Sequence, residues 1–143
     1  MTHLDPYESL GFHCNITLKA FIANLEERLK GSGITPTQHR ALAHLVALGS
    51  MPQSELAEHL AITPASGVRL VDRMERDGWV SRRPDPNDGR IKRVEPTPKA
   101  FAVWTEISKV GRQILAKAYQ GIPAEEIETV KRVLAQVRHN LAQ

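Results

Sequence analysis

The stretch from Ser81 to Arg93 reads SRRPDPNDGRIKR and concentrates charged side chains around a turn-forming centre. Its basic residues are Arg82, Arg83, Arg90, Lys92 and Arg93, and its acidic residues are Asp85 and Asp88. The local surplus of three positive charges equals the formal net charge of the whole chain, +3. Prolines and an Asp-Gly pair between two short strand-like runs predict a β-hairpin. These residues therefore predict a cationic finger suited to an anionic partner.

A second group of candidate contact residues lies on a helix predicted at 64–77. In a helix-turn-helix that reads DNA, residues near the start of the second helix reach base edges. The inner face is expected to hold Val68, Val71 and Met74, and the outer face holds Ala65, Ser66, Arg69 and Arg73, with Thr63 directly before the helix. This outer face is small at the front and basic behind, as entry into a groove requires. The free N–H groups of the helix start favour a phosphate, and arginine suits guanine edges.

The same helix also fits a simpler interpretation. Its charged residues include Arg69, Asp72, Arg73 and Arg76. Charges at such spacings form internal ion pairs on many solvated helix faces that have no nucleic-acid partner. The helix-turn-helix before this segment and the basic hairpin after it favour DNA contact instead.

The elements that position these groups are mostly helical. Three Thr-Pro pairs predict helix starts, because threonine caps free N–H groups and proline fits the first helical position. Apolar spacing and glycine stops predict helices at 9–30, 36–48, 53–60, 64–77, 98–120 and from 123 onward. The order is four helices, a hairpin and two helices. This order predicts a mainly α fold with a small β-hairpin, a winged helix-turn-helix.

The helices at both chain ends predict dimerisation. Apolar residues of the last helix step by three and four, at Ile127, Val130, Leu134, Val137 and Leu141. Such stripes exceed what a small winged core can cover, so we expect part of them to pack against a second subunit. We therefore expect dimerisation helices at 1–34 and 98–143 around a winged helix-turn-helix DNA-binding core at 35–97.

Composition argues against several other classes of protein. The chain has 143 residues, 41% of them hydrophobic, which fits one domain with a core. It has no apolar run of membrane-spanning length and no secretory signal, so we expect no membrane partner. A single cysteine favours a reducing, cytoplasmic setting. No nucleophile–base set or phosphate loop predicts an enzyme, and no cofactor is expected. Six histidines predict no metal site, because His39 and His44 do not share a helix face.

The segment from Ser54 to Ala100 resembles the DNA-binding core of the MarR family of bacterial transcription regulators. The matching pieces are ELAEHL, RLVDRMERDGWVSRRPDPNDGR and the closing TP. The number and order of the flanking helices are also similar to the family, and its Asp-x-Arg wing signature matches Asp88-Gly89-Arg90. The resemblance implies a homodimer with interdigitated terminal helices and a recognition helix in each of two major grooves. It also implies a wing arginine in a flanking minor groove, oriented by the wing aspartate.

The resemblance implies a ligand-responsive repressor that binds a pseudo-palindromic operator in double-stranded DNA. The expected DNA contacts are Thr63, Ala65, Ser66, Arg69, Arg73, Arg82, Arg83, Asp88, Arg90 and Lys92. It also implies a small-molecule effector, aromatic or anionic. His13, Thr17 and His39 are candidates for lining its pocket, although ordinary junction positions explain them equally well.

Some residues depart from the family pattern or leave alternatives open. Pro96 and Ala100 replace the usual leucine and glycine, so we expect the second strand to end early and the following hinge to be stiff. One branch of the family senses peroxide with a cysteine near the position of Cys14. We expect Cys14 to be buried and inert, and a thiol-based oxidant sensor is the alternative. From a different class, a winged domain can serve protein–protein assembly without binding DNA.

Overall fold

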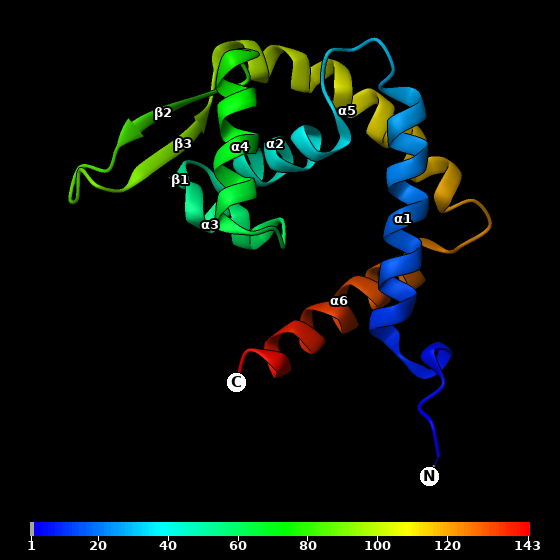
Figure 1. Cartoon of the computed structure of the whole chain (residues 1–143). Helices are drawn as coiled ribbons and strands as arrows, with labels where there is room; N and C mark the ends of the chain where they lie inside the picture. Colours follow the sequence, from blue (N-terminus) through cyan, green and yellow to red (C-terminus); the bar gives the residue numbers. More distant parts are fainter. Residues whose placement is uncertain (1) are drawn as a thin grey trace.

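The computed structural model describes residues 2–143, and its architecture is the predicted winged helix (Figure 1). Met1, the first residue of the predicted N-terminal dimerisation segment, lies outside the described residues. In chain order the elements are η1 (Pro6–Glu8), α1 (Leu10–Arg28), α2 (Pro36–Leu48), β1 (Met51–Pro52), α3 (Gln53–His59), α4 (Pro64–Arg76), β2 (Val80–Pro84), β3 (Lys92–Pro96), α5 (Pro98–Ala118) and α6 (Ala124–Leu141). The fold is mainly helical, with one small antiparallel sheet.

Each of the three Thr-Pro pairs begins a helix, as predicted. The hydroxyl of Thr35 accepts a hydrogen bond from the backbone N–H of Gln38 at 3.1 Å, and the Gln38 side chain accepts one from the Thr35 N–H at 3.1 Å. Thr63 and Thr97 cap α4 and α5 through the same kind of side-chain contact. These local bonds satisfy donors that have no partner inside the helix, so the helix starts are encoded locally.

The sheet has the strand order β1-β3-β2, which places the second wing strand in the middle. Its last residue, Pro96, pairs with Val80, so the expectation that this strand ends early is wrong. Proline has no N–H to donate, but the next residue, Thr97, donates its own N–H to the carbonyl oxygen of Trp79 at 3.1 Å. The ladder therefore continues past the proline.

The core lies in one lobe, beneath α2, α3, α4 and the sheet. Its largest fully buried side chains are Leu42, Leu45, Leu56, Val71, Met74, Val80 and Val94. The predicted inner face of α4 is partly wrong, because Val68 is 39% exposed. Gly67 is buried in its place, and a Cβ atom there would lie 2.8 Å from the Cβ of Ala57 on α3. The missing side chain lets α3 and α4 approach closely.

Three contacts join the C-terminal end of α4 to the start of two other helices. The Gln38 side chain of α2 donates to the Asp77 carboxylate at 3.2 Å. The Lys99 ammonium of α5 donates to the Asp77 carbonyl at 2.8 Å, and the Thr97 hydroxyl donates to the Gly78 carbonyl at 2.6 Å. One end of α4 is therefore fixed to α2 and α5.

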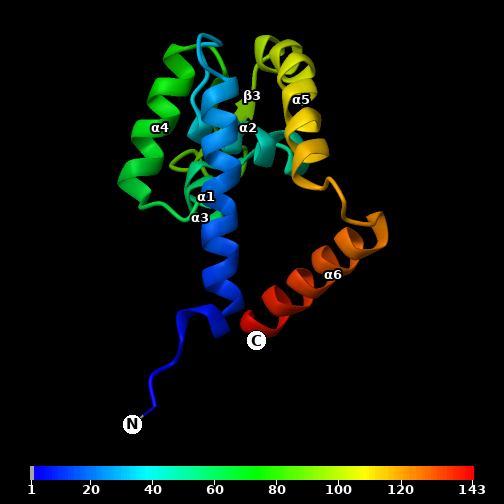
Figure 2. The same cartoon turned by 90° about the vertical axis from the view of Figure 1, so that its right-hand side faces the viewer.

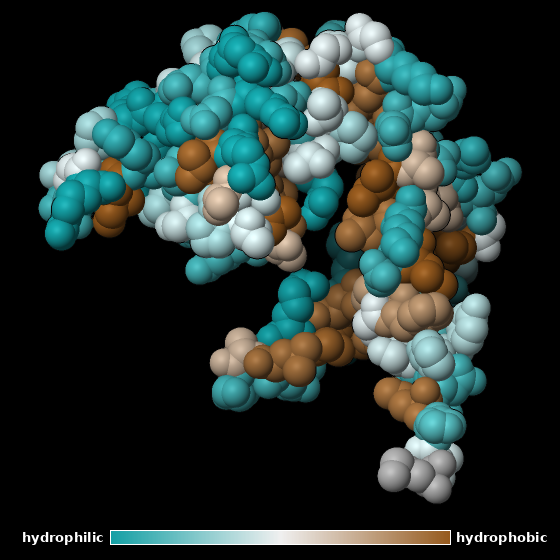
Figure 3. Space-filling view, viewed as in Figure 1, coloured by the Kyte–Doolittle hydropathy of each residue, from teal (hydrophilic) through white to brown (hydrophobic). Residues whose placement is uncertain are grey.

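The helices outside the lobe bury little of their apolar surface. Helix α6 turns back from the end of α5 and lies beneath the lobe (Figures 1 and 2), and none of its residues is buried. Val130 is 55% exposed and Leu141 is 81% exposed. Hydrophobic residues gather along α6 and along the helices beside it (Figure 3). This chain alone leaves these faces uncovered.

Candidate nucleic-acid interface

The start of α4 presents a small polar surface followed by two arginines. The Thr63 hydroxyl donates to the Ser66 hydroxyl at 2.9 Å, and the Arg69 guanidinium donates to the same Ser66 oxygen at 3.1 Å. Ala65 and Arg73 are exposed, as the predicted outer face requires. The first turn holds no acidic residue, so no carboxylate competes with a phosphate for its free N–H groups.

The wing tip holds one arginine in a fixed orientation. The Arg90 Nε donates to Asp88 Oδ1 at 3.1 Å, and its Nη2 donates to Oδ2 at 3.1 Å. Hydrogen bonds from the Arg90 side chain and then from its backbone N–H lower the pKa of the Asp88 carboxyl below its usual value. The Arg90 side chain is nevertheless 91% exposed. Asp88 thus orients the guanidinium without covering it.

A second aspartate builds the turn that carries this pair. The Asp85 carboxylate accepts hydrogen bonds from the backbone N–H groups of Asn87, at 2.8 Å, and Asp88, at 3.2 Å. It also accepts from Arg93 at 3.3 Å, and Arg93 donates to the carbonyl oxygen of Ser50 at 2.7 Å. The bond from Asn87, followed by those from Asp88 and Arg93, lowers the pKa of Asp85. Arg93 therefore supports the wing, a role that the sequence did not reveal.

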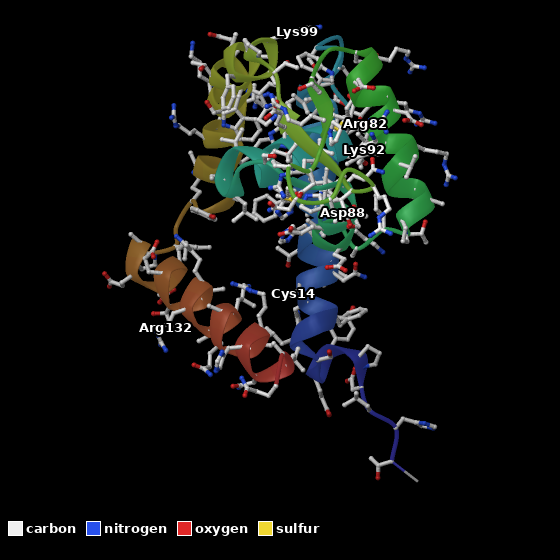
Figure 4. The ribbon with its side chains drawn as sticks, turned by 90° about the vertical axis from the view of Figure 1, so that its left-hand side faces the viewer. Cys14, Arg82, Asp88, Lys92, Lys99 and Arg132 are labelled. Carbon is white, nitrogen blue, oxygen red and sulfur yellow. The ribbon has the colours of Figure 1, made fainter. Side chains whose placement is uncertain are left out.

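The other basic residues of the hairpin divide into paired and unpaired groups. Figure 4 places Arg82, Lys92 and Asp88 in order from the root of the wing toward its tip. Arg82 pairs with acids of α4, and Arg83 pairs with Glu95 on the neighbouring strand. Lys92 is exposed and has no ion-pair partner within residues 2–143, and the same holds for Arg69 and Arg73. The predicted cationic surface is therefore present, but only part of its charge is free.

The predicted effector residues do not lie together. Thr17 lines an apolar cavity of about 560 Å³ between α1, α5 and α6, whereas His13 and His39 do not line it. The His13 ring lies 2.9 Å from the Tyr7 carbonyl oxygen at the N-terminal turn. The His39 ring stacks on Trp104 with 5.2 Å between ring centroids, where α2 meets α5, and burial lowers its pKa.

The structure corrects the expectation for Cys14, which is exposed on α1 rather than buried (Figure 4). It lies on a stretch of α1 that has no buried residue, because no other part of this chain covers that face. In the part of the chain that the structure describes, no cluster of three or more potential ligands is arranged to hold a metal. None of the helices in residues 2–143 combines the length and apolar character that a membrane crossing requires.

Comparisons with known proteins identify the family. The family model of the MarR family matches residues 32–91, which span α2, α3, α4 and most of the wing. The chain is 30% identical to a probable transcriptional regulator from Pseudomonas aeruginosa, over 93% of this chain and 99% of that one, with a TM-score of 0.71. This chain belongs to the MarR family. It is a MarR-family transcriptional regulator with the winged helix fold.

Two further structures resemble this MarR-family chain. A MarR-family regulator from Silicibacter pomeroyi is 25% identical, with 97% of this chain and 96% of that one covered and a TM-score of 0.82. A mutant of MarR from E. coli, in complex with operator DNA, is 26% identical, with 90% and 92% covered and a TM-score of 0.76. The segment that the MarR family model matches contains both parts of the candidate interface, the start of α4 and the wing tip.

Proposed function

We propose that this chain is a homodimeric repressor that binds a pseudo-palindromic DNA operator and is released by a small-molecule effector. The observation that carries the proposal is Arg90, which Asp88 holds in a bidentate pair at the wing tip while leaving it 91% exposed. The complex of the E. coli relative with operator DNA supports the same partner.

The two exposed arginine positions are suited to different grooves. Arg69 follows the small N-terminal residues of α4, so this end can enter a major groove and Arg69 can read a base edge there. Arg90 lies at the end of a narrow hairpin, which suits the minor groove, where focused negative potential attracts arginine. Lys92 and Arg73 add phosphate contacts on either side. Together they would read sequence at one groove and shape at the next.

The uncovered faces of α1, α5 and α6 support a homodimer. The cavity between these helices is lined mainly by apolar residues, among them Phe21, Ile127 and Leu134. We assign this cavity to a second copy, because apolar faces of this extent are stabilised by burial. Two copies related by a two-fold axis present two α4 helices, and this geometry demands two symmetric half-sites.

The effector is assigned to the junction between the lobe and the dimerisation helices. His39 and Trp104 stack there, and both are partly buried. A stacked aromatic pair offers a flat surface to an aromatic effector. Of the three candidates from the sequence, His39 lies at this junction, and His13 and Thr17 lie elsewhere on α1.

The test is a selection of bound fragments from random DNA at two salt concentrations. Arg69→Ala should relax base preference at one position of each half-site, a loss of about 1–3 kcal/mol for a bidentate contact. Arg90→Ala should weaken binding to many sequences and lower the salt slope by about 0.9, the change expected for one phosphate contact. Arg138→Ala, an exposed arginine of α6, is the control and should match wild type.

Two outcomes contradict the proposal. If Arg90→Ala binds the selected operator as wild type does at both salt concentrations, the wing does not contact DNA. If wild type binds no DNA at low salt, the assembly-module alternative replaces the proposal. The oxidant-sensor alternative is not proposed, because it depends on the single exposed thiol of Cys14 alone.

A further inference from the structure

Arg82 lies at the root of the wing, and its side chain contacts two helices of the lobe. Its Nη2 donates to Asp72 Oδ1 at 2.5 Å and to Glu75 Oε1 at 3.1 Å, both on α4. Its Nη1 donates to Gln53 Oε1 on α3 at 3.4 Å. The backbone N–H of Arg82 also donates to Glu75 Oε2 at 3.1 Å. One residue of β2 therefore joins the wing to both helices of the helix-turn-helix.

These contacts distinguish Arg82 from the other wing arginines. Its side chain is 21% exposed, compared with 65% for Arg83 and 91% for Arg90. A side-chain hydrogen bond from Arg82 is the main reason why the pKa of Glu75 is lowered. Two ionised acids thus surround Arg82 at neutral pH, and its donors face protein rather than solvent. A phosphate would have to compete with both carboxylates for the same guanidinium.

We infer that Arg82 is a positioning residue, which fixes the angle between the wing and α4 so that Arg90 and Arg69 reach adjacent grooves together. The inference rests on the proposed DNA binding. It also explains Asp72 and Glu75, two acids on a helix expected to approach a polyanion. By charge alone each acid weakens DNA binding, but as partners of Arg82 they hold the two contact elements in one arrangement.

The inference predicts an unusual sign for the loss of an acid. If Arg82 contacted phosphate, Asp72→Asn would strengthen binding, because it removes a repelling charge and frees the guanidinium. If Arg82 positions the wing, Asp72→Asn weakens binding, because it loosens the wing on α4. Asp72 is 54% exposed, so the fold should tolerate this substitution.

The experiment uses the full-length chain and the tightest fragment that wild type selects from random DNA. Arg82→Gln and Asp72→Asn should each lower affinity for this fragment about tenfold, a coupling within the usual range for contacting charges, and leave the salt slope unchanged. Arg73→Gln removes an exposed arginine without an ion pair and is the matched control. It should lower the salt slope by about 0.9. Hydroxyl-radical footprints of the first two variants should lose the outer, wing-dependent protection and keep the central protection.

Each result decides between defined alternatives. The inference is wrong if Arg82→Gln lowers the salt slope as Arg73→Gln does, or if Asp72→Asn tightens binding. Thermal denaturation of each variant separates lost folding from lost positioning. If Arg82→Gln does not fold, Asp72→Asn and Glu75→Gln carry the same test of sign. Failure of the wild type to bind any DNA would instead overturn the proposed function.

Discussion

At the scale of single residues, the acids around each arginine decide what it can contact. Arg69 bonds only to Ser66, and Arg90 is oriented but exposed, whereas Arg82 and Arg93 are bound within the protein. The sequence predicted this cationic group as a whole. It could not separate contact residues from supporting ones, because the partners come from different elements and their approach depends on the folded register.

Stability should respond to the protonation of His39, whose pKa is lowered by burial. Because the unfolded chain then binds a proton more readily than the folded one, the free energy of unfolding should fall as pH drops below about 6.5. His39→Phe keeps an aromatic ring on Trp104 and should give a shallower dependence in urea denaturation between pH 7 and 5. Some dependence should remain, because burial, followed by the charges of His59 and Arg40, lowers the pKa of His44 too.

The matched control for this experiment is His3→Gln, at an exposed position in the N-terminal segment. It should reproduce the wild-type dependence on pH. If His39→Phe reproduces it as well, then the buried imidazole is not the group that titrates.

At the scale of elements, local signals predicted the helices well and close contacts poorly. The Thr-Pro pairs gave helix starts that the structure confirms, since capping is satisfied within three residues. The strand β1 was missed because two residues, one of them proline, carry no strand pattern, and its pairing with β3 depends on distant residues. The inner face of α4 was misassigned at Val68 because the sequence does not show that Gly67 lies against Ala57.

This contact predicts the effect of enlarging Gly67. Alanine is the better helix former by about 1 kcal/mol, yet Gly67→Ala should destabilise the fold, because overpacking a close contact costs about 1–3 kcal/mol. Chemical denaturation would measure the change. Adding Ala57→Gly should recover most of the loss, since it removes the opposing Cβ atom. Losses that simply add in the double variant would show that the two residues do not press against each other.

At the scale of the whole molecule, the lobe is packed and the outer helices are not. The buried core belongs mainly to α2, α3, α4 and the sheet, whereas no residue within α1 or α6 is buried. The heptad spacing of α6 predicted an interface from the sequence, and the bare helix supports it. The division into 1–34, 35–97 and 98–143 stays a prediction, because only a dimer would define it.

A charge in the groove between α1, α5 and α6 should separate the subunits. Leu134 lines this groove, so Leu134→Asp places an unpaired carboxylate in an apolar interface, which should cost several kcal/mol and abolish the dimer. Gln136→Asp adds the same charge on the exposed side of α6 and should leave the dimer intact. Light scattering measures the mass of both variants. A stable Leu134→Asp dimer would refute this placement of α6.

The attachment of α4 at one end makes it a lever. Gln38, Lys99 and Thr97 hold its C-terminal end, while the base-reading end is the opposite one. A helix of this length spans about 20 Å, so a rotation of about 10° at the fixed end moves the free end by about 3 Å. A good hydrogen bond tolerates only about 0.5 Å. A small tilt of α5 against α2 is therefore amplified into complete loss of base contact, and an effector needs to move its own surroundings very little.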